Sequence, residues 1–210
     1  MSGNINMLVS HIVASYKVLY DKIYECFTKS EKTDTDNRMF DKVSYYNQYS
    51  TFLCYPTHII DNIYLGSAYN AANYNLLKEL NIKLIINITK EISNYYPEDY
   101  TYKKYEINDN DTADISLFLE DVYKTIKENS DKNIMIHCFM GASRSVSGVV
   151  YYLMKEHKMS LEDAIKYIKD KRSAINPNNK FVSTLKTLDQ DVTKINITEN
   201  DIIDEHYSNK

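Results

Sequence analysis

Residues 134–145 of this 210-residue chain read IMIHCFMGASRS, and this stretch decides the fold. It opens as an apolar run typical of a buried strand and ends that run on Cys138. Arg144 follows after five intervening residues, and an apolar segment with helical spacing comes next. A strand, a Cys-x5-Arg loop and a helix in this order predict a site for a bound oxyanion, because the loop amides and the helix dipole converge there.

The two functional side chains of the loop indicate which chemistry to expect. The planar fork of Arg144 can bind two phosphate oxygens at once. The same positive field should lower the pKa of the Cys138 thiol from about 8.5 towards the range of roughly 3.5–7.5 found at helix N-termini and beside cations. A thiolate that faces a phosphate cradle indicates phosphoryl transfer through a phosphocysteine, which water then hydrolyses.

Three neighbouring residues favour this hypothesis over the alternative that Cys138 is simply a small core hydrophobe. Gly141 stands where the loop must turn tightly to aim its amides inward. Ser145 places a hydroxyl where it can hydrogen-bond the thiolate as a leaving group. His137 can donate to nearby backbone and brace the loop.

Four motifs resemble a known family and occur in its order: IYLGS at 63–67, HCFMGASRS at 137–145, YLMK at 152–155 and KRSxxNPNxxF at 171–181. The second is similar to the signature of the cysteine-based protein tyrosine phosphatases. Its SRS ending is most similar to their dual-specificity branch, which includes the MAP kinase phosphatases and slingshot. The resemblance covers about residues 56–192. It implies a phosphatase of phosphotyrosine and phosphoserine or phosphothreonine in proteins.

The reaction also needs a general acid, since protonation of the departing oxygen contributes roughly 10²–10⁴ in rate. The segment after the strand expected at 102–107 can supply a loop that carries it. Asp114 is expected to begin the next helix, where a carboxylate accepts backbone N–H bonds. The pattern DNxxADI at 109–115 is similar to the family pattern whose first Asp is the acid. Asp109 is therefore predicted as the acid, with Asp111 as the alternative.

In the mechanism that follows, Cys138 attacks phosphorus, Asp109 protonates the leaving oxygen and Ser145 eases the later departure of the thiolate. Neither a metal nor another cofactor is required. The phosphate is expected to be bound by the loop amides and the guanidinium, and the substrate-binding residues are Phe139, Met140, Gly141, Ala142, Ser143 and Arg144.

Patterning predicts one catalytic domain at 56–192 with an extension on each side. In the N-terminal extension, 1–55, residues 5–27 carry apolar side chains every three or four positions. They predict an amphipathic helix that docks on the catalytic domain, on a partner or on a second copy of the chain, and a polar linker follows it. Residues 193–210 form a polar tail.

Strands alternate with helices from Pro56 onward, which predicts an α/β fold with a mainly parallel sheet flanked by helices on both faces. Ligands of such sheets bind at the carboxyl ends of the strands, where Cys138 stands. The expected strands, of which the first can be a hairpin arm, are 58–65, 83–88, 102–107 and 134–138. The expected helices are 71–80, 114–128, 145–156, 160–169 and a last one capped by Asn178.

Composition excludes several other classes. A net charge of −4 argues against a nucleic-acid-binding protein. No apolar run reaches the roughly 18 residues of a membrane span, and no signal peptide is visible. Cys26, Cys54 and Cys138 lie far apart, show no metal-ligand spacing and do not form the even set of a disulfide framework. A reducing compartment such as the cytoplasm fits best, and a nuclear or virion location stays open.

Three other functions compete with this hypothesis. A phospho-binding pseudophosphatase is disfavoured because Cys138, Arg144 and an acid candidate are all present. A phosphoinositide phosphatase is disfavoured because Phe139, Met140 and Ala142 stand where lipid-directed relatives carry lysines. RNA 5′-triphosphatase activity is disfavoured because the net charge of the chain is negative. The sequence leaves open the physiological substrate, the preference between phosphotyrosine and phosphoserine or phosphothreonine, and the oligomeric state.

Overall fold

The structure is a computed structural model that describes residues 55–189. The helix predicted at 5–27 and the tail predicted at 193–210 lie outside this range, and so does the linker except for its last residue. Within the described part of the chain, no helix is long and apolar enough to cross a membrane.

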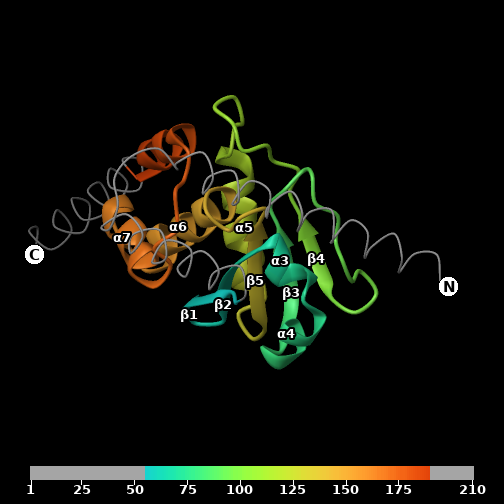
Figure 1. Ribbon diagram of the computed structural model, residues 1–210. Coiled ribbons are helices and arrows are strands. Elements are labelled where there is room, and N and C mark those ends of the chain that lie inside the picture. The colour runs from blue at the N-terminus through green and yellow to red at the C-terminus, as the bar shows by residue number, and fades with distance from the viewer. Residues whose placement is uncertain (1–54, 190–210) are drawn as a thin grey trace, which may run out of the picture. The chain divides into compact units, whose positions relative to one another are not determined.

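A five-stranded sheet lies at the centre, with the strand order β1-β2-β5-β3-β4 (Figure 1). The first two strands form an antiparallel hairpin, and every other neighbouring pair is parallel. The predicted mainly parallel sheet is therefore confirmed. The strands are β1 (Thr57–Ile60), β2 (Ile63–Ser67), β3 (Ile82–Asn87), β4 (Thr101–Lys104) and β5 (Asn133–Cys138).

Helices cover both faces of the sheet, as the alternation along β5 shows. Ile134 and Ile136 point into the larger core, which the C-terminal helices close, whereas Met135 points into a smaller core with Ala71 and Leu77. The helices are α3 (Ala68–Ala72), α4 (Tyr74–Glu79), α5 (Ser116–Glu128), α6 (Arg144–Glu156), α7 (Leu161–Lys171) and a helical stretch at 179–189.

The structure differs from the expected elements in two places that matter for the site. The helix expected at 71–80 is two helices, because the Asn73 side chain accepts the N–H of Leu76 at 3.1 Å and starts α4 afresh. The strand expected at 102–107 ends at Lys104, after which the Tyr105 ring packs on Phe118 of α5. The chain thereby leaves the sheet early and crosses towards the end of β5.

The two predicted helix caps at Ser160 and Asn178 are confirmed by their hydrogen bonds. Ser160 Oγ accepts the N–H of Asp163 at the start of α7, and Asn178 Oδ1 accepts the N–H of Phe181 before the last helix. The helix expected to begin at Asp114 instead begins at Ser116, whose N–H donates to Asp114 Oδ1 at 2.9 Å. These side chains fix the entry points of the helices that surround the end of β5.

Candidate active site

The loop between β5 and α6 turns its carbonyls away from Cys138. Each of the four carbonyls of residues 139–142 accepts a hydrogen bond from outside the loop: Phe139 from Ala68 N–H at 3.0 Å, Met140 and Gly141 from Arg172 Nη2 and Nε at 3.2 and 2.9 Å, and Ala142 from Asn176 N–H at 2.8 Å. In a trans peptide the next N–H points opposite to the carbonyl. The amides of residues 140–143 therefore point inward, as an oxyanion cradle requires.

Cys138 lies at the centre of this cradle and is 1% exposed. Its Sγ accepts the Gly141 N–H at 3.3 Å and the Ser145 hydroxyl at 3.2 Å. Burial alone raises the pKa of the thiol, but the hydroxyl and amide of Ser145, the charge of Arg144 and the amide of Ser143 outweigh it. The pKa of Cys138 consequently lies below its ordinary value, and the thiolate is stabilised.

Arg172 supports the loop from behind. It is 1% exposed, donates to two loop carbonyls and gives a third hydrogen bond to Thr57 Oγ1 at 3.2 Å. Burial lowers the pKa of Arg172 to about 10, so the side chain stays charged at neutral pH. The sequence contained this residue only as part of a family motif and assigned it no role. In the structure it holds two loop carbonyls outward, and the N–H of Gly141, which follows the first of them, donates to the sulfur of Cys138.

Gly141 is the residue on which the loop conformation depends. Its φ is +69°, and a Cβ placed there would lie 2.5 Å from the carbonyl oxygen of Gly66 and 2.7 Å from Arg172 Nη2. A left-handed backbone and a contact with fixed backbone both exclude a side chain. Glycine is required here because of close packing behind the cradle.

We expect Gly141→Ala to lower the free energy of unfolding by roughly 2–4 kcal/mol, since backbone strain and overlap add. Urea unfolding measures the effect. Gly148→Ala in α6 is the matched control: its Cβ would meet only side-chain ends of Ile88 and Val122 at 3.3 and 3.4 Å. Helix propensity offsets that crowding, so the control should stay within about 1 kcal/mol of the parent. Equal losses in both variants would contradict this account.

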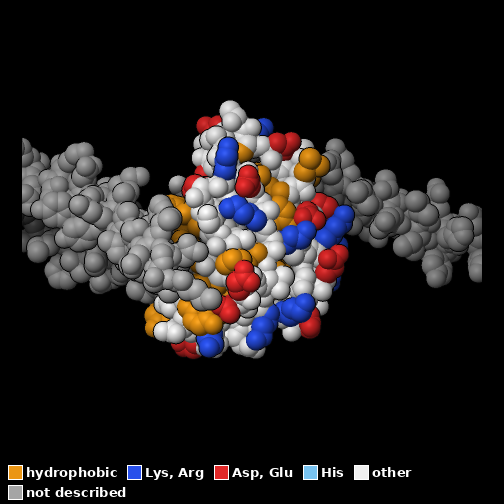
Figure 2. Space-filling model, turned by 90° about the vertical axis from the view of Figure 1, so that its right-hand side faces the viewer, with side chains coloured by type: hydrophobic (Ala, Val, Ile, Leu, Met, Phe, Trp, Pro, Cys, Tyr) orange, Lys and Arg blue, Asp and Glu red, His pale blue; other side chains and the backbone are white. Residues whose placement is uncertain are grey.

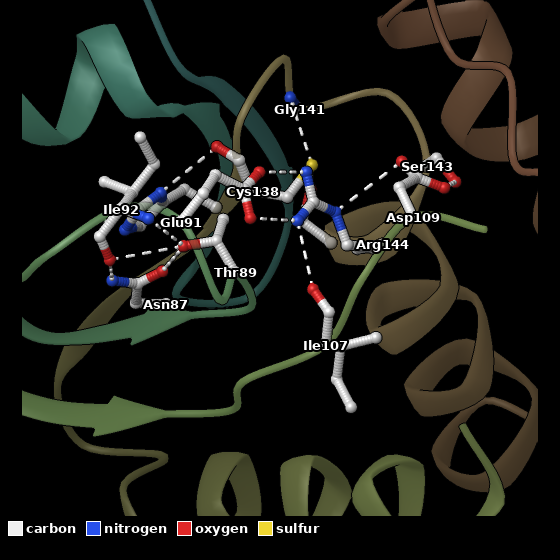
Figure 3. A network of polar contacts seen from close by, with 12 residues as sticks. Asn87, Thr89, Glu91, Ile92, Ile107, Asp109, Cys138, Gly141, Ser143 and Arg144 are labelled. Carbon is white, nitrogen blue, oxygen red and sulfur yellow. Dashed lines mark hydrogen bonds and ion pairs between the residues drawn. The ribbon is translucent and has the colours of Figure 1, made fainter. Parts of the chain in front are cut away.

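Arg144 begins α6 and is held by Glu91 in a two-pronged ion pair (Figure 3). Its Nη1 lies 2.8 Å from Oε2, its Nη2 lies 2.7 Å from Oε1, and Nη1 also donates to the carbonyl of Ile107 at 3.1 Å. The Nε–H is buried and has no hydrogen-bond partner among the described residues. The edge of the guanidinium formed by Nε and the second Nη2 N–H is therefore available for two oxygens of a ligand.

Glu91 reaches Arg144 because a polar network folds the segment after β3. The Ile92 carbonyl accepts from Asn87 Nδ2 at 2.9 Å, from Thr89 Oγ1 at 3.3 Å and from Lys104 Nζ at 2.5 Å (Figure 3). Asn87 and Thr89 are fully buried. Sequence reasoning missed Glu91; the available signal was two polar residues at the end of a buried strand, which need partners in a structured loop.

Replacement of Glu91 should weaken catalysis without removing it. Glu91→Gln turns a charge-assisted fork into a neutral contact, and the carboxylate is 44% exposed, so we expect kcat/KM to fall about tenfold. Burial raises the pKa of Glu91, but hydrogen bonds and the charge of Arg144 lower it to below its ordinary value. The pair is thus present at neutral pH. Glu98→Gln, an exposed change in the same connection, is the control, and equal effects would refute the positioning role.

Asp109 and Asp111 are both exposed, but Asp109 lies beside Arg144. Oδ1 of Asp109 accepts from Ser143 Oγ at 2.8 Å and from Asn178 Nδ2 at 2.7 Å. Its Oδ2 lies 3.6 Å from Arg144 Nε. The structure therefore places the acid candidate chosen from the sequence against the available edge of the guanidinium.

His137 is buried directly before Cys138. Burial lowers its pKa to about 4, so the imidazole is neutral at physiological pH. Its Nδ1 lies 3.2 Å from the carbonyl oxygen of Cys138, to which it donates. The bracing contact expected from the sequence is thus made with the backbone of Cys138.

A mainly parallel sheet with a buried Cys-x5-Arg cradle at the end of its central strand defines the protein tyrosine phosphatase-like class of α/β folds. The chain belongs to the family described as "Dual specificity phosphatase, catalytic domain", whose sequence profile matches residues 63–191. The resemblance read from the motifs is therefore confirmed.

Relatives support the same assignment. Protein phosphatase Slingshot homolog 2 from Homo sapiens is 36% identical over 134 residues, which are 62% of this chain and 9% of that protein. Dual specificity protein phosphatase 1 from Arabidopsis thaliana is 34% identical over 137 residues, 64% of this chain and 69% of that one. This chain thus spans most of the plant protein but less than a fifth of the Slingshot proteins that it matches.

Solved structures share the fold. The human tyrosine phosphatase-like serine/threonine/tyrosine-interacting protein superimposes with a TM-score of 0.61 at 26% identity, covering 68% of this chain and 97% of that one. Human DUSP28 gives a TM-score of 0.62 at 21% identity, covering 66% and 95%. The predicted phosphatase-like fold is confirmed by these similarities.

Proposed function

We propose that this chain hydrolyses phosphotyrosine and phosphoserine or phosphothreonine monoesters in proteins through a phosphocysteine intermediate. The observation that carries the proposal is the arrangement around Cys138: four loop carbonyls turned outward and a buried guanidinium with an available Nε–H. Inward amides and the Nε–H of Arg144, which has no hydrogen-bond partner among the described residues, fit three equatorial phosphate oxygens, whose charge they stabilise in the transition state.

In the first step the Cys138 thiolate forms a bond to phosphorus while the bond from phosphorus to the substrate oxygen breaks. Asp109 gives its proton to that oxygen, which leaves as a phenol or an alcohol. The electron pair of the broken bond stays on the departing oxygen. Loop amides and Arg144 hold the transferring group throughout.

In the second step Asp109, now ionised, takes a proton from a water molecule, whose oxygen attacks phosphorus. The bond to sulfur breaks, and the electron pair returns to Cys138 as a thiolate. The hydroxyl of Ser145, 3.2 Å from Sγ, stabilises this leaving group by hydrogen bonding. Inorganic phosphate is released, and Asp109 is again protonated.

Protein substrates are favoured over the alternatives. Residues 139–143 contain no cation, so an inositol headgroup with several phosphates gains little beyond Arg144. On the face drawn in Figure 2, Lys and Arg side chains lie interspersed with Asp and Glu, which does not resemble the basic surface of a nucleic-acid-binding protein. The relatives are named protein phosphatases.

Hydrolysis of para-nitrophenyl phosphate by the full chain tests the proposal. Activity should survive a chelator and be inhibited by vanadate, which occupies the same oxyanion cradle. Iodoacetate should alkylate Cys138 faster at pH 6 than it alkylates free cysteine, because a lowered pKa leaves more thiolate there. Chelator-sensitive activity or an ordinary alkylation profile would overturn the mechanism.

The N-terminal extension carries a separate proposal: we expect residues 5–27 to dock on a partner or on a second copy of the chain. We also expect the protein to work in a reducing compartment such as the cytoplasm. Sedimentation of the full chain beside one that starts at Pro56 tests self-association. Full-length dimers and truncated monomers are expected; identical monomers would remove the dimer hypothesis.

A further inference from the structure

The segment 176–178 joins the phosphate loop to the acid-bearing segment. The N–H of Asn176 donates to the Ala142 carbonyl at 2.8 Å, and the N–H of Asn178 donates to Ser143 Oγ at 3.2 Å. Two residues of this connection therefore contact two residues of the loop. Pro177 lies between them and restricts the backbone to a narrow range of φ.

The side chain of Asn178 makes two further contacts in opposite directions. Its Oδ1 accepts the N–H of the buried Phe181 and so caps the last helix. Its Nδ2 donates to Asp109 Oδ1 at 2.7 Å. Since the cap fixes the orientation of the amide, the Nδ2–H is held towards Asp109 rather than turning freely.

Asp109 Oδ1 is thus doubly occupied. Ser143 Oγ donates to it at 2.8 Å, and Ser143 itself receives the backbone N–H of Asn178. A carboxylate oxygen has two lone-pair sites, and both of these are filled by donors. Oδ2 has no such pair of donors and lies on the side of Arg144, 3.6 Å from Nε.

We propose that Asn178 is a positioning residue for the general acid: with Ser143 it fixes Oδ1 of Asp109, so that Oδ2 is the oxygen that carries and delivers the proton. The inference rests on the proposed function. In the first step the O–H bond of Oδ2 breaks as the departing substrate oxygen gains the proton. In the second step Oδ2 takes a proton back from water. Asn178 itself touches neither substrate nor phosphorus.

The dependence of kcat/KM on the leaving group distinguishes a loss of acid positioning from a general loss of active-site structure. A good leaving group, such as a phenol with a low pKa, departs without protonation, whereas unsubstituted phenol needs the acid. Asn178→Ser removes the amide but keeps a good helix cap. We expect its kcat/KM to fall about tenfold on phenyl phosphate and less than twofold on an aryl phosphate with a strongly activated leaving group.

Two other variants complete the experiment. Asp109→Asn should show the same selectivity more strongly, with a loss of about 10²- to 10³-fold on phenyl phosphate. Ser160→Ala removes the cap of α7, away from the site, and should lower stability without changing the ratio of the two substrates. Thermal unfolding of each variant reports whether folding is intact.

The outcomes are distinguishable. A selective loss in both Asn178→Ser and Asp109→Asn supports the inference. Selectivity in Asp109→Asn alone, or an equal loss on both substrates in Asn178→Ser, overturns it and leaves the general acid assigned. No selectivity in Asp109→Asn overturns both the acid assignment and the positioning role, while the nucleophile is tested independently through Cys138.

Discussion

Cys138→Ser should reduce hydrolysis of phosphopeptides by about 10⁴- to 10⁶-fold, the range expected when the nucleophile of a covalent mechanism is lost. A serine hydroxyl at this position stays protonated at neutral pH, whereas the structure lowers the pKa of the native thiol. The amides of the loop and Arg144 are unchanged, so the variant should still bind a phosphopeptide. Initial rates and titration of a labelled phosphotyrosine peptide measure the two effects.

A Cys138→Ser variant that binds the phosphopeptide but does not hydrolyse it would support Cys138 as the nucleophile. If Cys138→Ser kept activity within tenfold of the parent, the covalent pathway would be wrong. A variant that neither binds nor turns over must first be shown to fold, by thermal unfolding, before it is interpreted. Added inorganic phosphate should raise its unfolding temperature, because a ligand that binds the folded state alone stabilises it.

Arg144→Lys is expected to lower kcat/KM by about 10³- to 10⁴-fold although the charge is kept. Lysine lacks the planar fork, so the variant loses both the edge that faces the phosphate and the two-pronged pair with Glu91. Each transition-state donor of this kind contributes about 10²–10³ in rate. Steady-state kinetics on phenyl phosphate and on a phosphopeptide measure the loss.

Lys166→Arg, a lysine-to-arginine exchange in an exposed ion pair, is the control. The side chains of Lys166 and its partner Asp170 are 72% and 62% exposed, so this variant should leave the kinetics unchanged. An Arg144→Lys variant with parental activity would show that a point charge suffices, and the role of the fork would be refuted.

Local sequence was enough to predict the centre of the site. Cys138, Gly141, Arg144 and Ser145 lie within eight consecutive residues, so the strand and helix around them determine where they meet. The position of the acid candidate, Asp109, was harder to predict, because it depends on where β4 ends. The sequence placed that end at residue 107, and the structure ends the strand at Lys104.

Two residues distant in sequence from the loop, Glu91 and Arg172, were not assigned a role from the sequence. Glu91 is 53 residues from Arg144, and Arg172 is 31 residues from the carbonyl of Gly141 that it binds. No periodicity or spacing relates such positions, since only the sheet order and the return of the chain after α7 bring them together. The break at Asn73 in the helix expected at 71–80 was missed for a different reason: a capping residue inside a helical segment competes with continuation of the helix.

The outward carbonyls of residues 139–142 have a consequence for protein engineering. Their donors come from Ala68, Arg172 and Asn176, all outside the Cys-x5-Arg motif. Transplanting HCFMGASRS alone between a strand and a helix of an unrelated scaffold would leave those four acceptors to water, and the peptide planes would rotate. A successful graft must carry the surrounding donors as well, because the nine residues of the loop do not hold their own conformation without them.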